Sequence, residues 1–327
     1  SFATTLGSGA QSVTFTDTAA HILEGVADPT LLPFGYNFSL LRKNDPSALS
    51  LNFNNASPLT IQSFLSSGTG GLDDSALGGA IRAAGALTLT GSGAVTFDNN
   101  MVISGGDNSI RGGAVYVGGS FTMGGDANGK FTFTGNQAQN ADNSGILVNS
   151  GLGGAIFVGG AAFFNNATYI FANNFAFAGG GGSGGGQGGA LNLAGPASFN
   201  DGSYTFSSNE AYSYGSDHAA YGGAIAAQNG LFFTSGSYLF DLNGIHGADQ
   251  GGAGSMDNSC YGGALYVAGG PLVINNGDYT FSNNFIVNEK GDYSGRGGAI
   301  YSAGDLIMSG GSYAFTGNFV QGLNTGM

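Results

Sequence analysis

The chain has 327 residues, of which 64 are glycine, with a formal net charge of −13 and only 8% charged residues. An acidic surface repels phosphate, so this composition excludes nucleic acid as an expected partner and disfavours anionic lipid surfaces. No apolar run approaches the ~20 residues that span a bilayer, so no transmembrane segment is predicted. Low charge together with 12% aromatic residues also argues against intrinsic disorder.

Residues 1–75 are expected to form an N-terminal cap with irregular strands. They contain strand-like pieces at 12–17 and 48–55 and four of the six prolines. Within the second piece, the string LNFNN is interpreted as a degenerate copy of a Phe-x-x-Asn motif that recurs later in the chain. The cap is therefore expected to include an irregular first coil.

Residues 76–327 are internally repetitive, which is the main feature of the sequence. Gly-Gly-Ala-(Ile/Leu/Val) occurs seven times at spacings of 34 to 41 residues, beginning at Gly78, Gly112, Gly153, Gly188, Gly222, Gly262 and Gly297. Each copy is followed by Phe-x-x-Asn, at Phe97–Asn100, Phe133–Asn136, Phe171–Asn174, Phe206–Asn209, Phe240–Asn243, Phe281–Asn284 and Phe315–Asn318. The coupling of the two motifs defines about seven repeats.

Each repeat reads as three or four short strands. In GGALYVA, Leu265 and Val267 share one face and Ala264 and Tyr266 the other, as expected for strand alternation. The glycines exclude a helical repeat, since each costs roughly 1 kcal/mol inside a helix. Propeller blades carry polar outer strands, which these repeats lack. We predict an all-β parallel β-helix (β-solenoid), right-handed, with one coil per repeat.

The recurring residue types have physical roles in such a coil. A glycine pair permits a positive φ at a corner and a close approach between coils. The motif asparagines are expected to form a ladder of side-chain hydrogen bonds that satisfies buried turn groups. An aromatic ring two residues before the motif Phe should stack on its counterparts in neighbouring coils; these rings are Tyr169, Tyr204, Tyr238, Tyr279 and Tyr313.

The repeat pattern is interrupted at the carboxyl end. The chain stops nine residues after Asn318, shortly before the next glycine pair falls due. The repeat region is therefore expected to be C-terminally truncated, as a piece of a longer protein.

Variable segments separate each motif Asn from the next glycine pair. They are predicted to be loops, at 101–111, 137–152, 175–187, 210–221, 244–261 and 285–296. Eight of the 14 acidic residues beyond residue 75 fall in them: Asp107, Asp142, Glu210, Asp217, Asp249, Asp257, Glu289 and Asp292. Arg111, Lys290 and Arg296 lie there too. Insertions on one side of a solenoid often form its binding face, although loops also simply collect solvent-exposed residues.

Other candidate motifs carry little chemistry. The glycine-rich run 178–189 is predicted to be a flexible loop rather than a phosphate site, because no Lys-Ser/Thr follows it. The single Cys260 is expected to be half-buried, with a reactive thiol as the less favoured reading.

No metal or cofactor is predicted. The three histidines lie far apart in the sequence, at His21, His218 and His246. His246 with Asp249 and Asp257 is considered as a metal set, but exposed loop residues are the favoured reading.

An enzyme is not predicted. β-Helix enzymes that cut acidic polysaccharides need clustered carboxylates, or basic residues that neutralise a uronate. Beyond residue 75 the basic residues are only five: Arg82, Arg111, Lys130, Lys290 and Arg296. The candidate aspartates occupy different points of their repeats and do not form an evident pair: Asp126, Asp201, Asp241 and Asp278.

The coupled motifs resemble the passenger region of the polymorphic outer membrane protein family of autotransporters, best known from chlamydiae. The resemblance covers about residues 77 to 318 and involves both family motifs seven times. It implies a secreted β-helical passenger, displayed on a bacterial outer membrane by a C-terminal barrel and acting as an adhesin. The very low charge and the glycine-rich segments depart from the usual members.

The leading hypothesis is therefore an extracellular adhesin at a bacterial cell surface. Its expected partner is a host or neighbouring-cell surface protein or glycan, bound through the variable loops. The alternative is a self-associating structural fibre, in which the chain forms homo-oligomers through its uncharged faces. A polysaccharide-degrading β-helix enzyme is the third and least favoured hypothesis.

Overall fold

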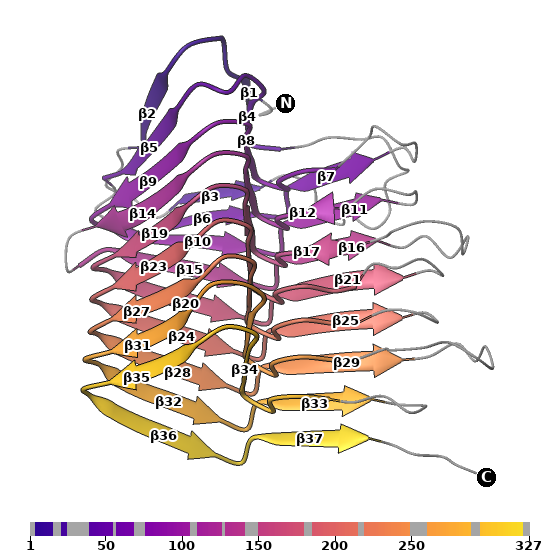
Figure 1. The fold of residues 1–327 in the computed structure, drawn as a ribbon. Coiled ribbons are helices and arrows are strands. Elements are labelled where there is room, and N and C mark those ends of the chain that lie inside the picture. Colours follow the sequence, from indigo (N-terminus) through magenta and orange to yellow (C-terminus); the bar gives the residue numbers. More distant parts are fainter. Residues whose placement is uncertain are drawn as a thin grey trace.

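The protein is an all-β solenoid of parallel strands (Figure 1). The computed structural model describes residues 4–15, 21–24, 39–54, 57–68, 76–104, 110–125, 128–140, 150–179, 185–214, 219–248, 260–288 and 295–322. Every regular element in these ranges is a β-strand. Within the same ranges, no helix is long and apolar enough to cross a membrane. The predicted all-β solenoid fold is confirmed.

Two sheets carry the first two strands of each coil. Sheet A contains, in spatial order, β1 (Thr4–Thr5), β4 (Leu41–Lys43), β8 (Ile81–Ala83), β13 (Val115–Val117), β18 (Ile156–Val158), β22 (Leu191–Leu193), β26 (Ile225–Ala227), β30 (Leu265–Val267) and β34 (Ile300–Ser302). Sheet B contains β2 (Gln11–Phe15), β5 (Leu49–Phe53), β9 (Leu87–Gly91), β14 (Phe121–Gly125), β19 (Ala162–Asn165), β23 (Ala197–Asn200), β27 (Leu231–Thr234), β31 (Leu272–Asn275) and β35 (Leu306–Ser309).

Two further sheets complete the coil. Sheet C contains β3 (His21–Glu24), β6 (Leu59–Gln62), β10 (Ala94–Asp98), β15 (Lys130–Thr134), β20 (Thr168–Ala172), β24 (Ser203–Ser207), β28 (Ser237–Asp241), β32 (Asp278–Ser282) and β36 (Ser312–Thr316). Sheet D contains β7 (Leu65–Gly68), β11 (Met101–Ser104), β16 (Gln137–Asn140), β21 (Phe175–Gly179), β25 (Glu210–Tyr214), β29 (Gly244–Ala248), β33 (Phe285–Asn288) and β37 (Phe319–Gly322). A short pair, β12 (Ile110–Arg111) and β17 (Gly151–Leu152), leads back to sheet A.

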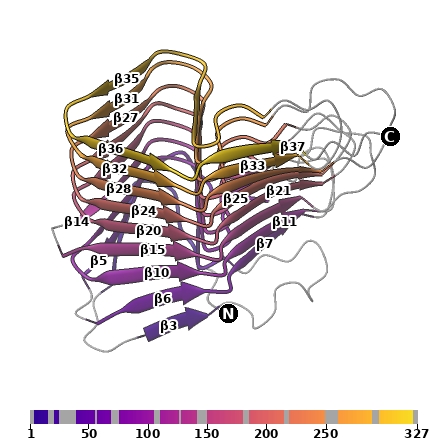
Figure 2. The same cartoon turned by 90° about the horizontal axis from the view of Figure 1, so that it is seen from below.

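Sheets A, B and C enclose one continuous hydrophobic core along the solenoid axis. Sheet D instead projects to one side as an arm (Figure 2). Alternate residues of each core strand point inward, as in β9, where Leu87 and Leu89 are buried and Thr88 and Thr90 are half-buried. The predicted strand alternation therefore decides which side chains reach the core and which face outward.

The first strands extend the same sheets toward the amino end. Residues 4–68 contribute β1 to β7, which pair in register with the coils that follow. The interpretation of LNFNN as a Phe-x-x-Asn copy is wrong. Phe53 lies in sheet B and pairs with Gly91, whereas the place equivalent to Phe97 in sheet C is held by Ile61.

The two glycines of each pair do different jobs. Gly188 adopts a φ of +64°, and the first glycine of every repeat has a similar positive value. Gly189 has an ordinary φ, but a Cβ there would overlap the carbonyl oxygen of Gly223 in the next coil and the backbone of Glu210. One glycine permits the corner, and the other permits the close approach of neighbouring coils.

The motif asparagines form a buried ladder along the corner between sheets C and D. Each Nδ2 donates to the Oδ1 of the next Asn at 2.8 to 3.0 Å, from Asn100 to Asn318. At Asn209, Nδ2 also donates to the carbonyl oxygen of Phe171, while Oδ1 accepts from both Nδ2 and the backbone N–H of Asn174. All four hydrogen-bonding positions of the amide are filled, which removes the cost of burying it.

Aromatic columns run parallel to this ladder inside the core. The motif Phe rings stack from Phe97 to Phe315 with centroids 4.7 to 5.1 Å apart. The Tyr rings two residues earlier stack likewise, 4.7 to 5.3 Å apart from Tyr169 to Tyr313. These separations are close to the strand spacing of about 4.8 Å, so the stacking expected from the sequence follows directly from register.

The variable segments do not begin as loops. Each of the six opens with a strand of sheet D, namely β11, β16, β21, β25, β29 or β33. The sequence indicated three or four strands in each repeat, and the structure has the fourth strand after every one of these six motif asparagines. Loop boundaries drawn at the motif Asn are therefore wrong, because backbone pairing continues for four or five residues beyond it.

Replacing Asn209 by alanine should destabilise the solenoid strongly. The change leaves the backbone N–H and one side-chain N–H of Asn174 without their shared acceptor and removes a donor from the carbonyl oxygen of Phe171. We expect a loss of about 2–4 kcal/mol in the free energy of unfolding. Urea unfolding followed by circular dichroism measures it. Asn166→Ala is the matched control, since Asn166 is exposed. Equal effects of the two substitutions would contradict the role given to the ladder.

Gly189→Ala should be as harmful, for a steric reason. The new Cβ forces the coils apart at the sheet D corner, and we expect a cost of about 3 kcal/mol or more. Gly7→Ala is the control, because nothing lies within 4 Å of a Cβ at that exposed position. Thermal unfolding of both variants compares them, and a melting temperature unchanged by Gly189→Ala would refute the close-approach argument.

Candidate functional site

The arm built on sheet D has one face turned inward and one outward. Its inner face carries small and aliphatic residues such as Ala211, Ile245 and Ile286, which pack against Ala220 and Cys260 of the returning chain. A matching cluster lies nearer the amino end, formed by Ala76, Val102, Ile110 and Ala138. Because these two layers are complete, the other face of sheet D is left to the solvent.

Aromatic side chains gather on that outer face. We call this set the aromatic patch; it consists of Phe175 and Phe177 from β21, Tyr212 and Tyr214 from β25, His246 from β29 and Phe285 from β33. All are half-buried. Neighbouring ring centroids lie 5.3 to 6.3 Å apart across four adjacent strands. A continuous row of half-buried, outward-facing rings is unusual on a soluble surface and is a candidate binding face.

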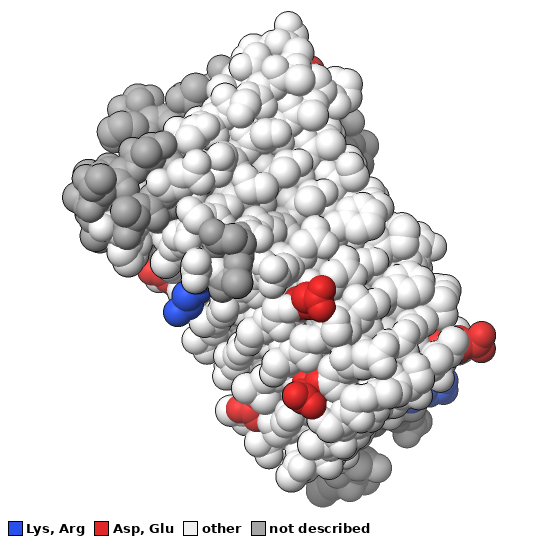
Figure 3. All heavy atoms as spheres, turned by 90° about the vertical axis from the view of Figure 1, so that its left-hand side faces the viewer, with Lys and Arg blue, Asp and Glu red and all other residues white. Residues whose placement is uncertain are grey.

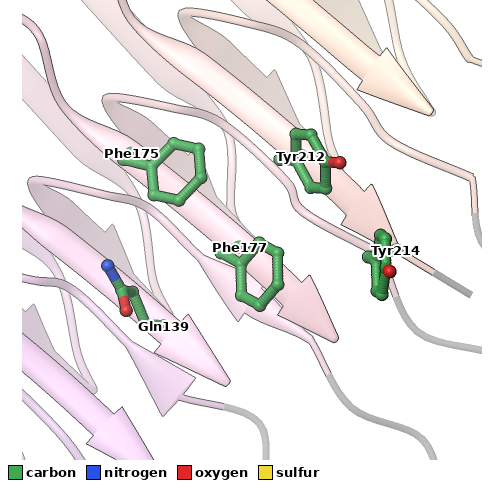
Figure 4. Close-up of a pocket in the computed structure, with 5 residues that line it drawn as sticks. All are labelled: Gln139, Phe175, Phe177, Tyr212 and Tyr214. Carbon is green, nitrogen blue, oxygen red and sulfur yellow. The ribbon is translucent and has the colours of Figure 1, made fainter. Parts of the chain in front are cut away.

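A hollow opens within the patch (Figure 4). It has a volume of about 290 Å³ and is lined by Gln139, Phe175, Phe177, Tyr212 and Tyr214. The rings come from β21 and β25, while Gln139 lies beside them on β16. Mostly apolar walls with a few polar groups are typical of sites that bind small organic groups.

Polar groups border the rings. Oε1 of Glu210 lies 3.4 Å from Nε2 of His246, and the His246 ring packs against Tyr212 and, edge-on, against Phe285. Burial raises the pKa of Glu210 above its ordinary value, and the nearby His246 opposes part of that rise. At the other border, Gln139 donates a hydrogen bond to Gln137. The border thus offers both donors and acceptors to a polar ligand.

Little acid–base chemistry is assembled at this face. Glycoside hydrolysis generally uses two carboxylates, and among the described strands of sheet D Glu210 is the one carboxylate. Asp201, Asp241 and Asp278 lie elsewhere, each accepting a hydrogen bond from a serine of the next coil. Figure 3 shows that the side where sheets B and C meet is mostly uncharged, with isolated acidic groups.

Several predicted candidates lie outside the described residues. They are Asp107, Asp126, Asp142, Asp217, His218, Asp249, Asp257, Glu289, Lys290 and Asp292, so the proposed metal set around His246 is not tested. The same holds for residues 180–184 of the glycine-rich run. Among the residues that the structure describes, no three His, Cys, Asp or Glu side chains lie close enough to hold a metal ion.

The aromatic patch was not predicted from the sequence. A signal was present in FAFAG at 175–179 and EAYSY at 210–214, where aromatic residues alternate with small ones. Period-two alternation of this kind indicates a strand with small residues packed inward and rings outward. Because these segments were predicted to be loops, this alternation was not interpreted as a strand.

Comparison of the chain with models of protein families, with curated proteins and with solved structures finds no match. The chemistry of the described faces therefore carries the functional argument.

Cys260 should be unreactive in the folded protein. Its side chain is fully buried rather than half-buried as expected, and this burial raises the pKa of the thiol to about 11. At pH 8 only on the order of 0.1% is thiolate, the form that reacts. Labelling with a chromogenic disulfide should be slow in buffer and reach one equivalent in denaturant. Rapid labelling of native protein would contradict the packing of the arm.

Proposed function

We propose that this chain is the passenger region of an autotransporter-like surface protein and acts as an adhesin at a bacterial cell surface. The proposal places the ligand on the aromatic patch of sheet D rather than on the variable loops alone. The coupled repeat motifs support the family assignment. A row of half-buried, outward-facing rings with a hollow between them supports binding, and it is the observation that carries the proposal.

A neutral glycan is the ligand class that suits the patch best. The C–H face of a sugar ring is apolar and weakly positive, so it packs well on the negative face of an aromatic ring. Sugar hydroxyls need partners beside those rings, and Gln139, Glu210 and His246 supply them at the border. The patch repeats its rings from strand to strand, which suits successive residues of an oligosaccharide.

Self-association is the second candidate function, because two copies would also bury the exposed rings against each other. Sedimentation velocity distinguishes the two candidates. We expect the purified chain to remain a monomer, so that the patch is free for a ligand. A dimer or longer polymer that dissociates on substitution of Phe177 would favour the fibre instead.

The glycan proposal predicts that Phe177→Ala combined with Tyr212→Ala weakens neutral glycan binding. Removing two rings from the hollow should weaken binding by about tenfold or more. Titration of a neutral oligosaccharide, selected on an immobilised glycan panel, measures the affinity by calorimetry.

Phe163→Ala is the matched control, because Phe163 is 41% exposed but lies on sheet B, away from the patch. It should bind as tightly as the unmodified chain. Absence of binding to any member of the panel, or equal losses in the control and the double variant, would contradict the proposal.

A further inference from the structure

All four arginines of this acidic chain lie on or beside sheet A. Arg42 and Arg82 are the central, outward-facing residues of β4 and β8. Arg111 ends β12, and Arg296 occupies the equivalent place before the last glycine pair. Among the described residues, the outward positions of sheet A and this adjoining ladder contain no Asp or Glu. Positive charge is thus concentrated on one face of a protein with a net charge of −13.

Arg42 and Arg82 are directly opposite each other on neighbouring strands. Like charges in that arrangement are destabilising. Burial, and then the charge of Arg82, lower the pKa of Arg42 below its ordinary value. An anion bound between these two half-buried guanidinium groups would offset their mutual repulsion.

Two of these guanidinium groups each have a buried nitrogen without a hydrogen-bond acceptor among the described residues. The Nε atoms of Arg82 and Arg111 are buried and, within the described part of the chain, make no hydrogen bond. The ion pairs among those residues join Lys43 to Asp45 and His246 to Glu210, so neither includes an arginine. A buried donor without an acceptor destabilises the folded chain, so these arginines favour a bound anion that accepts hydrogen bonds from their guanidinium groups.

Aromatic residues continue the same face. Tyr116 follows Arg82 in register on β13, and its ring stacks on Phe157 of β18 with centroids 5.6 Å apart. The guanidinium carbon of Arg111 lies 5.1 Å from the centroid of the Phe157 ring. Arg111 is therefore held in place by a cation–π contact, and Tyr116, next to Arg82 in register, adds a hydroxyl to the same face.

We propose that this face binds an oxyanion of an acidic glycan, a carboxylate or a sulfate ester, through Arg42, Arg82 and Arg111. The planar forks of Arg42 and Arg82 match the two oxygens of such a group, and Tyr116 bonds to the hydroxyls of the sugar that bears it. A long polyanion is disfavoured by the overall negative charge, so recognition depends on short-range contacts with single charged groups. The site lies on a different sheet from the aromatic patch and goes beyond the neutral glycan function.

Calorimetric titration tests the proposal with three probes of equal length: an oligouronate, a sulfated oligosaccharide and the neutral counterpart of the uronate. We expect at least one charged probe to bind and the neutral one not to bind at this site. Arg82→Gln should weaken binding of the charged probe by about tenfold or more. Lys130→Gln removes the same charge from an exposed position on sheet C and should change the affinity less than about twofold.

Phe177→Ala separates this site from the aromatic patch, since it should leave binding of the charged probe unchanged. If Arg82→Gln does not fold by circular dichroism, Arg111→Gln replaces it with the same expected loss. Failure of both charged probes to bind would overturn the proposal. So would equal losses in the Lys130 and arginine variants, or tighter binding of duplex DNA or anionic vesicles than of either oligosaccharide.

Discussion

Parallel strands stacked about 4.8 Å apart place every side chain directly on its counterpart in the next coil, and the rest of the structure depends on this register. A residue type that recurs in every coil must therefore pack favourably against a copy of itself. Asparagine does so because its amide both donates and accepts, and the seven motif asparagines fill each other's hydrogen bonds. Phenylalanine does so by stacking, and glycine by leaving room for the next backbone. Charged residues cannot, which explains the very low charge of the strands.

The same register also decides where functional residues can lie. Inward positions are committed to the core, so chemical variety is confined to outward positions and to the segments between coils. Sheet D is the extreme case, because its inner face needs only a thin layer of small residues around Ala211 and Cys260. Its outer face is thereby free to carry the rings from Phe175 to Phe285. Sheet A uses its outward positions differently and concentrates arginine there. One scaffold thus presents two chemically distinct faces.

Much of the scaffold could be predicted from the sequence, because repetition reports directly on register. The glycine pairs, the Asn ladder and the Tyr and Phe columns all follow from that. The two faces proposed to bind ligands could not be predicted in the same way, since they depend on residues that differ between repeats. One column of sheet D, for example, shares no motif and consists of Gln137, Phe175, Glu210 and Gly244. The left-handed residue before each ladder Asn is Asn or Gly in five coils, the types that favour a positive φ, but it is Ser208 and Leu242 in the other two.

The central claim is that the core columns are structural and that ligands meet the outward rings of sheet D. Site-resolved NMR of a chain carrying isotope-labelled tyrosine tests it most directly, during titration with the neutral oligosaccharide that binds. We expect the ring signals of Tyr212 and Tyr214 to shift with ligand, while those of Tyr204 and Tyr238 in the core column stay unchanged. Shifts confined to other tyrosines, with Tyr212 and Tyr214 unaffected, would contradict it.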